Sequence, residues 1–247
     1  PMRSRSVDAR GIPTGATAPY PSATELLGEK VFDDGLIYEG HKILPYCSRC
    51  GTGLASHEVA QGYKMVKQDT VTVAFKRKDK EEYFLVWTTT PWTLASNVAL
   101  TVQPEYTYAR IKQGEHIYIM AKALIGDVMG EDVEILEEFP GKELEGIEYE
   151  QIMPFVEAKG KAFIVTLADY VTLEDGTGIV HTAPAFGEED YHTGRRYGLP
   201  VLQPVNEEGK FTATPWQGQF VMDADAQIVD WLRQEQKLYS KQRMEHN

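Results

Sequence analysis

Cysteine is almost absent from this chain, which has only Cys47 and Cys50 among 247 residues. Two cysteines cannot build the disulfide framework of a small secreted protein, and their Cys-x-x-Cys spacing is typical of a metal site or a redox pair. Long apolar runs are missing too. No stretch approaches the roughly 20 apolar residues that span a bilayer, and the first residues lack the apolar core of a signal peptide. We therefore expect a cytoplasmic protein with no membrane partner.

Positive charge is also scarce, because 37 acidic residues outnumber 25 basic ones and give a formal net charge of −12. This balance argues against a broad electrostatic grip on a phosphate backbone, so any contact with nucleic acid must be local. Apolar residues make up 42% of the chain. That content is enough for a core in one large domain or two small ones.

Residues 1–24 are rich in proline, glycine, serine, threonine and alanine, which is the composition of a flexible leader. We leave this leader out of the predicted fold, and whether it is foreign to the domain that follows stays open. Alternating β-branched and aromatic residues predict strands over residues 71–75, 83–87, 116–120, 133–139, 161–167 and 178–182. Shorter patterns predict helices over residues 92–99, 121–128, 187–197 and 223–236. The expected fold class is α+β, dominated by strands.

The sequence TTTPWT, which begins at Thr88, follows one of these predicted strands. Pro91 has no amide hydrogen and disfavours a helical conformation in the preceding residue, so the strand should end at Thr90. A short helix that begins at Pro91 and is capped by Thr90 explains the local sequence. Capping leaves the hydroxyls of Thr88, Thr89 and Thr93 unused. Together they would form a pocket for polar, mostly neutral groups beside a helix N-terminus.

A second motif, DGTGIVHTAPAFGEED, begins at Asp175. Its glycines lack the third member of a dinucleotide-binding fingerprint and predict a tight turn instead. Taken alone, His181 reads as a half-buried histidine and Asp190 as an acidic residue in the first turn of a helix. The loop between them can bring both residues to one cleft. A metal-dependent hydrolase that also used Glu188 and His192 is an alternative, but this spacing matches none of the familiar zinc motifs.

The Cys47-Ser-Arg-Cys50 motif is half of a structural zinc knuckle, since a tetrahedral site needs two further ligands. A thioredoxin-type redox pair would be followed by a helix, and Gly51-Thr52-Gly53 argues against one. The missing ligands are expected to lie outside this chain.

Taken together, three segments resemble the editing insertion of class I aminoacyl-tRNA synthetases, in the isoleucine-specific branch. They are GLIYEGHKILPYCSRCGTGLASHEV (35–59), WTTTPWTLASNVALTVQPEYTY (87–108) and GTGIVHTAPAFGEEDYHTGRRYGLP (176–200). The resemblance implies a barrel-like mixed sheet with short flanking helices. It places a connecting segment with the half zinc knuckle at 25–56, the editing domain at 57–222, and a return helix towards the synthetase body at 223–247. The family's His-Ile-Gly-His and Lys-Met-Ser-Lys-Ser synthetic motifs are absent.

The resemblance implies hydrolytic proofreading of mischarged Val-tRNA(Ile), with valyl-adenylate as a second substrate left open. A non-catalytic tRNA-binding module remains the alternative. The implied partners are the aminoacylated 3′ end of tRNA(Ile) and the rest of the synthetase, and the isolated domain is expected to be a monomer. Editing would need no cofactor, and zinc would bind Cys47 and Cys50 only in the full-length enzyme.

The resemblance also assigns roles to single residues. Thr89, Thr90 and Asp190 would be catalytic, with Asp190 binding the α-ammonium of the substrate. His181 would form a pocket wall that excludes isoleucine. The full set of implied substrate-binding residues is Thr88, Thr89, Thr90, Trp92, Thr93, Asn97, His181 and Asp190.

Overall fold

A computed structural model describes residues 30–36, 43–61, 65–130 and 132–246. The chain divides into two units, Pro1–Lys42 and Ile43–Asn247. In the first unit the described residues contain a helical turn over residues 30–33. The leader expected over residues 1–24 lies outside the described residues. Within the described ranges, no helix is long and apolar enough to cross a membrane.

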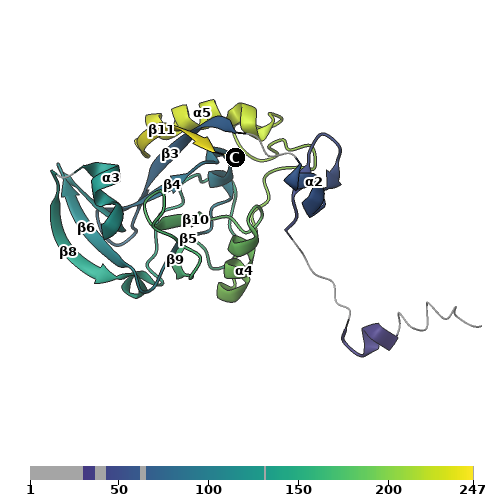
Figure 1. Ribbon diagram of the computed structural model, residues 1–247, viewed down its shortest axis with the longest axis horizontal. Coiled ribbons are helices and arrows are strands. Elements are labelled where there is room, and N and C mark those ends of the chain that lie inside the picture. Colours follow the sequence, from purple (N-terminus) through teal and green to yellow (C-terminus); the bar gives the residue numbers. More distant parts are fainter. Residues whose placement is uncertain (1–29, 37–42, 62–64, 131, 247) are drawn as a thin grey trace, which may run out of the picture. The chain divides into compact units, whose positions relative to one another are not determined.

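The second unit is organised around a mixed sheet of nine strands (Figure 1). The strands follow the order β8-β6-β7-β4-β10-β5-β9, with β3 paired to β4 and β11 paired to β3. Their bounds are β3 Val66–Lys76, β4 Glu82–Thr88, β5 Ala99–Val102, β6 Thr107–Gln113, β7 His116–Ala121, β8 Glu134–Pro140, β9 Ile164–Leu167, β10 Ile179–Thr182 and β11 Leu238–His246. A separate hairpin pairs β1 (Tyr46–Cys47) with β2 (Thr52–Gly53).

The sheet divides at β4. One edge of β4 pairs antiparallel with β3, with Val71 opposite Thr88 at one end of the ladder. The other edge pairs parallel with two different strands, with β7 through residues 82–84 and with β10 at Trp87. Because these two neighbours diverge from one edge, the sheet curls into a half-barrel (Figure 1). This confirms the barrel-like mixed sheet of the expected α+β class.

Short helices flank the sheet, and the longest of them, α5, lies beside β11 and β3 (Figure 1). The buried residues of α5 recur at helical spacing; they are Val221, Ala224, Ile228, Val229 and Leu232. The helices are α2 Ser56–Ala60, α3 Ile125–Met129, α4 Glu188–Tyr197 and α5 Val221–Gln234, with 3₁₀ turns η1 Pro91–Ser96, η2 Lys122–Leu124 and η3 Gly141–Leu144.

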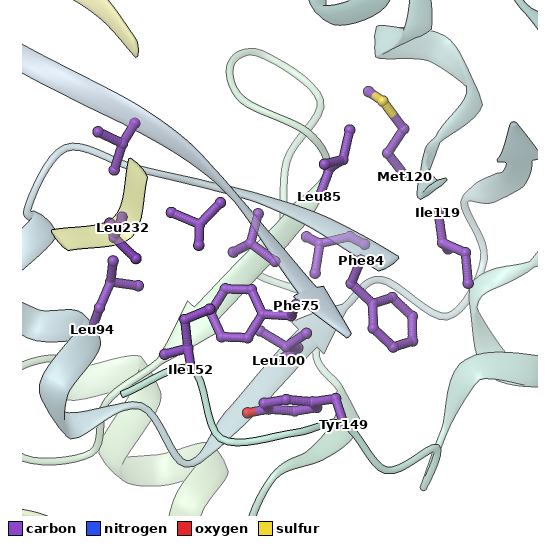
Figure 2. Close-up of a cluster of buried hydrophobic side chains, with 14 of the residues drawn as sticks. Phe75, Phe84, Leu85, Leu94, Leu100, Ile119, Met120, Tyr149, Ile152 and Leu232 are labelled. Carbon is purple, nitrogen blue, oxygen red and sulfur yellow. The ribbon is translucent and has the colours of Figure 1, made fainter. Parts of the chain in front are cut away.

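The main core lies between the sheet and these flanking elements. Figure 2 shows Phe75 of β3 and Phe84 of β4 in one cluster with Leu94 of η1 and Leu232 of α5. All four side chains are almost fully buried. Burial of each such side chain stabilises the fold by roughly 1.5–3 kcal/mol, so η1 and α5 are held against the sheet by the same apolar cluster.

The predicted strands are all present, and three longer strands were not predicted. β5 is buried on both faces and so shows no alternation, β6 contains Arg110 and Lys112, and β11 is mostly polar. The return helix expected over residues 223–247 is wrong beyond Gln234, because β11 follows and pairs antiparallel with β3. The last strand therefore belongs to the same sheet as the rest of the domain.

Candidate active site

The threonine peptide connects β4 to η1. β4 ends at Thr88, whose side chain is buried, and Thr89 and Thr90 are half-buried. The strand thus ends two residues earlier than expected. Pro91 begins η1 as predicted, but this element is a 3₁₀ helix that ends at Ser96, so the α-helix expected over residues 92–99 is wrong.

A row of hydroxyls runs from the end of β4 to β10. Thr88 Oγ1 lies 3.3 Å from Thr90 Oγ1, which lies 3.2 Å from Thr93 Oγ1. Thr93 Oγ1 is 2.8 Å from Nε2 of His181. The structure therefore brings together four of the predicted site residues, and we call Thr88, Thr90, Thr93 and His181 the hydroxyl cluster.

Counting protons assigns a direction to each bond in the hydroxyl cluster. A threonine hydroxyl carries one proton, and Thr93 donates its proton to the carbonyl oxygen of Thr90 at 2.8 Å. Thr93 Oγ1 must therefore accept from Thr90 Oγ1 and from Nε2–H of His181. The Thr90 proton is then used, so Thr88 donates to Thr90 Oγ1 while its own oxygen accepts the Thr90 amide. One lone pair is left on Thr88 Oγ1 and one on Thr90 Oγ1.

His181 is a neutral imidazole in this setting. Its side chain is only 8% exposed, and burial lowers its pKa from 6.5 to about 4. The bond to Thr93 selects the tautomer with hydrogen on Nε2, which leaves Nδ1 as an acceptor. Among the described residues, Nδ1 has no hydrogen-bond partner. The ring is thus fixed by one bond and offers one lone pair.

Thr90 occupies the N-cap position of η1, but its side chain makes no capping bond, so that prediction is wrong. Its hydroxyl belongs to the cluster instead. The amide of Trp92, in the first turn of η1, donates to Oδ1 of Asp225 on α5 at 3.1 Å. Asp225 lies 133 residues away in sequence, so no local pattern could have identified it.

The indole of Trp92 packs beside this peptide, against the loop that follows β10. Its ring meets Phe186 edge-on, with centroids 4.8 Å apart. Phe186 belongs to the loop that leads into α4. Trp92 therefore connects the first turn of η1 to the loop between β10 and α4.

Asp190 lies in the first turn of α4, a helix whose acidic start, basic end and C-terminal Gly198 agree with the prediction. Its Oδ2 accepts the Ala183 amide at 2.9 Å and its Oδ1 accepts the Tyr170 hydroxyl at 3.3 Å. Burial raises the pKa of Asp190, and these two bonds oppose the rise. Through Ala183 the carboxylate is tied to the strand end that carries His181.

Tyr170 was not predicted, and it joins Asp190 to a layer of buried threonines. Thr101 Oγ1 lies 2.6 Å from Thr182 Oγ1 and 2.9 Å from Thr166 Oγ1. Burial raises the pKa of Tyr170 and the charge of Asp190 adds to the rise. Hydrogen bonds with the hydroxyls of Thr101, Thr182 and Thr193 oppose it. The isolated tyrosine in ADYVT gives no sequence signal for such a contact.

Asn97 follows the last residue of η1 and is not part of the hydroxyl cluster. Its Nδ2 donates to the Ala99 carbonyl at 2.9 Å, and its Oδ1 accepts the Tyr149 hydroxyl at 2.6 Å. The residue is almost fully buried. Both ends of the amide are engaged by the protein, so Asn97 anchors the end of η1.

Cys47 and Cys50 lie on the turn of the β1–β2 hairpin, where the Cys50 amide donates to Cys47 Sγ at 3.4 Å. That bond holds the pKa of Cys47 below its usual value. This knuckle supplies two thiolates, whereas a structural zinc site needs four ligands. Across the described ranges, no three His, Cys, Asp or Glu side chains gather as a metal site, and Glu188 and His192 are exposed.

Comparison with known proteins adds a family assignment to this geometry. Residues 65–237 match the family model described as leucyl-tRNA synthetase, editing domain. An isoleucine--tRNA ligase of Clostridium novyi is 51% identical over 221 residues, which are 88% of this chain and 21% of that protein. The isoleucine--tRNA ligase of Thermus thermophilus is 46% identical over 225 residues, again 21% of its length. The chain thus spans about a fifth of these relatives.

Solved structures support the fold assignment. The crystal structure of GlLeuRS-CP1 is 14% identical and covers 69% of this chain and 96% of that one, with a TM-score of 0.57. The Plasmodium falciparum cytosolic leucyl-tRNA synthetase editing domain is 12% identical and covers 70% and 98%, with a TM-score of 0.55. At these identities the likeness concerns the fold alone.

Proposed function

This chain belongs to the family of aminoacyl-tRNA synthetase editing domains, and we propose that it removes valine from mischarged tRNA(Ile) by hydrolysing the ester. Hydrolysis of valyl-adenylate at the same site is left open as a second reaction. A hydrophobic pocket gains only about 1–3 kcal/mol from one methylene, so one selection step separates isoleucine from valine poorly. A second, smaller site that destroys the wrong product corrects the error.

The observation that carries the proposal is the hydroxyl cluster. Its proton count leaves acceptor lone pairs on Thr88 and Thr90, and both can receive a proton of a water molecule. A water held there attacks the ester carbonyl, and the bond to the ribose oxygen breaks. One water proton ends on that oxygen, and the other is released to solvent as the carboxyl group of the freed valine ionises. The aminoacyl ester is already reactive, so positioning and polarisation suffice without a covalent intermediate. Thr89, beside Thr90, is assigned to the same catalytic peptide.

The remaining residues bind the substrate in this proposal. Asp190 is held by the Ala183 amide and the Tyr170 hydroxyl, and it receives the α-ammonium in a charge-assisted bond. His181 forms the wall that excludes isoleucine, and its bond to Thr93 fixes that wall. Trp92 and Asn97 support the peptide from either end of η1.

The proposed partners are the aminoacylated 3′ end of tRNA(Ile) and the rest of a full-length synthetase. A net charge of −12 predicts weak binding of tRNA by this chain alone. Editing itself is assigned to protein side chains. Cys47 and Cys50 provide two of the four ligands of a structural zinc, which we assign to the full-length enzyme.

The test is deacylation of tRNA(Ile) charged with valine or with isoleucine, at low salt and with the chain in excess. We expect release of valine and retention of isoleucine. Asp190→Ala should abolish the release, whereas Glu189→Ala, which changes an exposed carboxylate in the same helical turn, should not. Binding without hydrolysis by the unaltered chain would favour the non-catalytic module. Equal rates for Asp190→Ala and the unaltered chain would refute the role of Asp190.

A further inference from the structure

We propose that Asp225 on α5 is a positioning residue of the hydroxyl cluster, whose carboxylate holds the first turn of η1 and thereby fixes the hydroxyls of Thr90 and Thr93. Its functional readout rests on the proposed deacylation. Neither the position of Asp225 in the sequence nor the roles implied by the family resemblance point to it.

The contact is direct and well placed. Asp225 Oδ1 accepts the Trp92 amide at 3.1 Å. The first amides of a helix have no partner within the helix, and a carboxylate is a favourable acceptor for them. The Thr90 side chain does not make this bond, because its hydroxyl is directed to Thr88 and Thr93. The distant carboxylate therefore leaves the Thr90 side chain free for the cluster.

Thr93, the residue after Trp92, links the threonine peptide to His181 in the hydroxyl cluster. Its hydroxyl donates to the Thr90 carbonyl and accepts from His181. A shift of the first turn of η1 would change the distance from Thr93 Oγ1 to His181, which lies on β10. Asp225 holds this turn through the backbone of Trp92, and Phe186 holds it through the indole ring. With either hold removed, the turn could move while the core residue Leu94 stays packed.

A carboxylate at this position is unfavourable for the fold. Burial and the nearby charge of Asp69 on β3 raise the pKa of Asp225 to about 6, although the hydrogen bond from the Trp92 amide opposes the rise. Asp69 itself pairs with Lys241 of β11 at 2.8 Å, and η1 carries no charged residue. An asparagine could accept the same hydrogen bond with no charge to bury. The ionised group is thus costly as a mere cap, which fits a role in the site.

The experiment compares Asp225→Asn, Asp225→Ala and the control Asp223→Asn, which changes an exposed carboxylate two residues away on α5. Steady-state deacylation over a range of Val-tRNA(Ile) concentrations and thermal unfolding are measured for each chain. We expect kcat to fall about threefold for Asp225→Asn and tenfold or more for Asp225→Ala, with KM changed less. Thermal stability of Asp225→Asn at pH 7.5 should be equal or higher. Asp223→Asn should match the unaltered chain.

The pH dependence separates positioning from a structural role. The ratio of rates between the unaltered chain and Asp225→Asn should fall from about three towards one as Asp225 is protonated below pH 6. An unchanged kcat in Asp225→Ala, or a ratio that does not vary with pH, would overturn the inference. If the unaltered chain hydrolyses nothing, the proposed function fails. In that case the NMR chemical shift of the Trp92 amide tests the contact with Asp225. It should change with pH around 6 in the unaltered chain and stay constant in Asp225→Asn.

Discussion

Replacing Thr93 by valine removes one hydroxyl from the centre of the hydroxyl cluster and keeps the branched shape of the side chain. The Thr90 carbonyl keeps a partner, because the Thr93 amide also donates to it at 3.1 Å. His181 loses its acceptor, so both of its ring nitrogens become unpaired in a side chain that is only 8% exposed. We therefore expect Thr93→Val to lower both the stability of the fold and the rate of deacylation.

The size of the stability change follows from two terms. Loss of a neutral hydrogen bond costs about 0.5–1.5 kcal/mol, and a buried donor left without a partner costs about 1–3 kcal/mol. Their sum is about 1.5–4.5 kcal/mol, which for a domain of this size lowers Tm by roughly 3–18 °C. Thr90 also loses the acceptor of its proton. If its hydroxyl rotates away from the productive position at a cost of about 1.4 kcal/mol, the rate falls about tenfold.

The assay pairs thermal unfolding with single-turnover deacylation of Val-tRNA(Ile). Thr107→Val is the matched control. It replaces the same side chain in the same way, but Thr107 is exposed at the start of β6, away from the cluster. The control should melt and react like the unaltered chain. If Thr93→Val behaves like Thr107→Val in both measurements, the assigned bond from His181 to Thr93 does not contribute, and the proton count built on it is wrong.

Two further predictions concern the residues around the cluster. Tyr170→Phe removes the hydroxyl that donates to Asp190 and should raise KM for Val-tRNA(Ile) more than it lowers kcat, whereas Tyr197→Phe, at the other end of α4, should leave both unchanged. His181 has a pKa lowered from 6.5 to about 4, so the unfolded chain binds its proton first as the pH falls. Between pH 6.5 and 4 the unaltered chain should therefore lose up to about 3 kcal/mol of stability relative to His181→Gln, measured by urea unfolding. Equal KM values for the two tyrosine variants, or parallel pH curves for the two histidine chains, would contradict these expectations.

The sequence predicted the parts of the fold that local patterns control. Alternation identified β4 and β10, and charge order identified α4 up to its C-terminal Gly198. β11 was missed, because an edge strand that pairs only with β3 has no need of apolar residues along its length. Such strands are recognised by their partner, which no local pattern shows.

The grouping of the candidate site's side chains was predictable from the sequence, whereas the hydrogen bonds between them were not. TTTPWT suggested a hydroxyl pocket, and the structure gathers three of its threonines around His181, which is 88 residues from Thr93 in sequence. The predicted cap at Thr90 is wrong because a distant carboxylate on α5 took the Trp92 amide. Local rules assign each hydroxyl its commonest partner, and tertiary contacts reassign them.

The pairing of β3 with β11 has a mechanical consequence. His246 lies opposite Val66, and the ladder continues to Leu238 opposite Val73, whereas β4 joins β3 only from Val71 onwards. The part of β3 before Val71 therefore pairs with β11 alone, and these two segments form a two-stranded ribbon at the edge of the sheet. A force that separates Val66 from His246 acts perpendicular to the two strands, so it breaks the hydrogen-bonded pairs of the ribbon one after another. These pairs can separate before the force is transmitted to the Val71–Thr88 pair, so the ribbon can move while the hydroxyl cluster keeps its geometry.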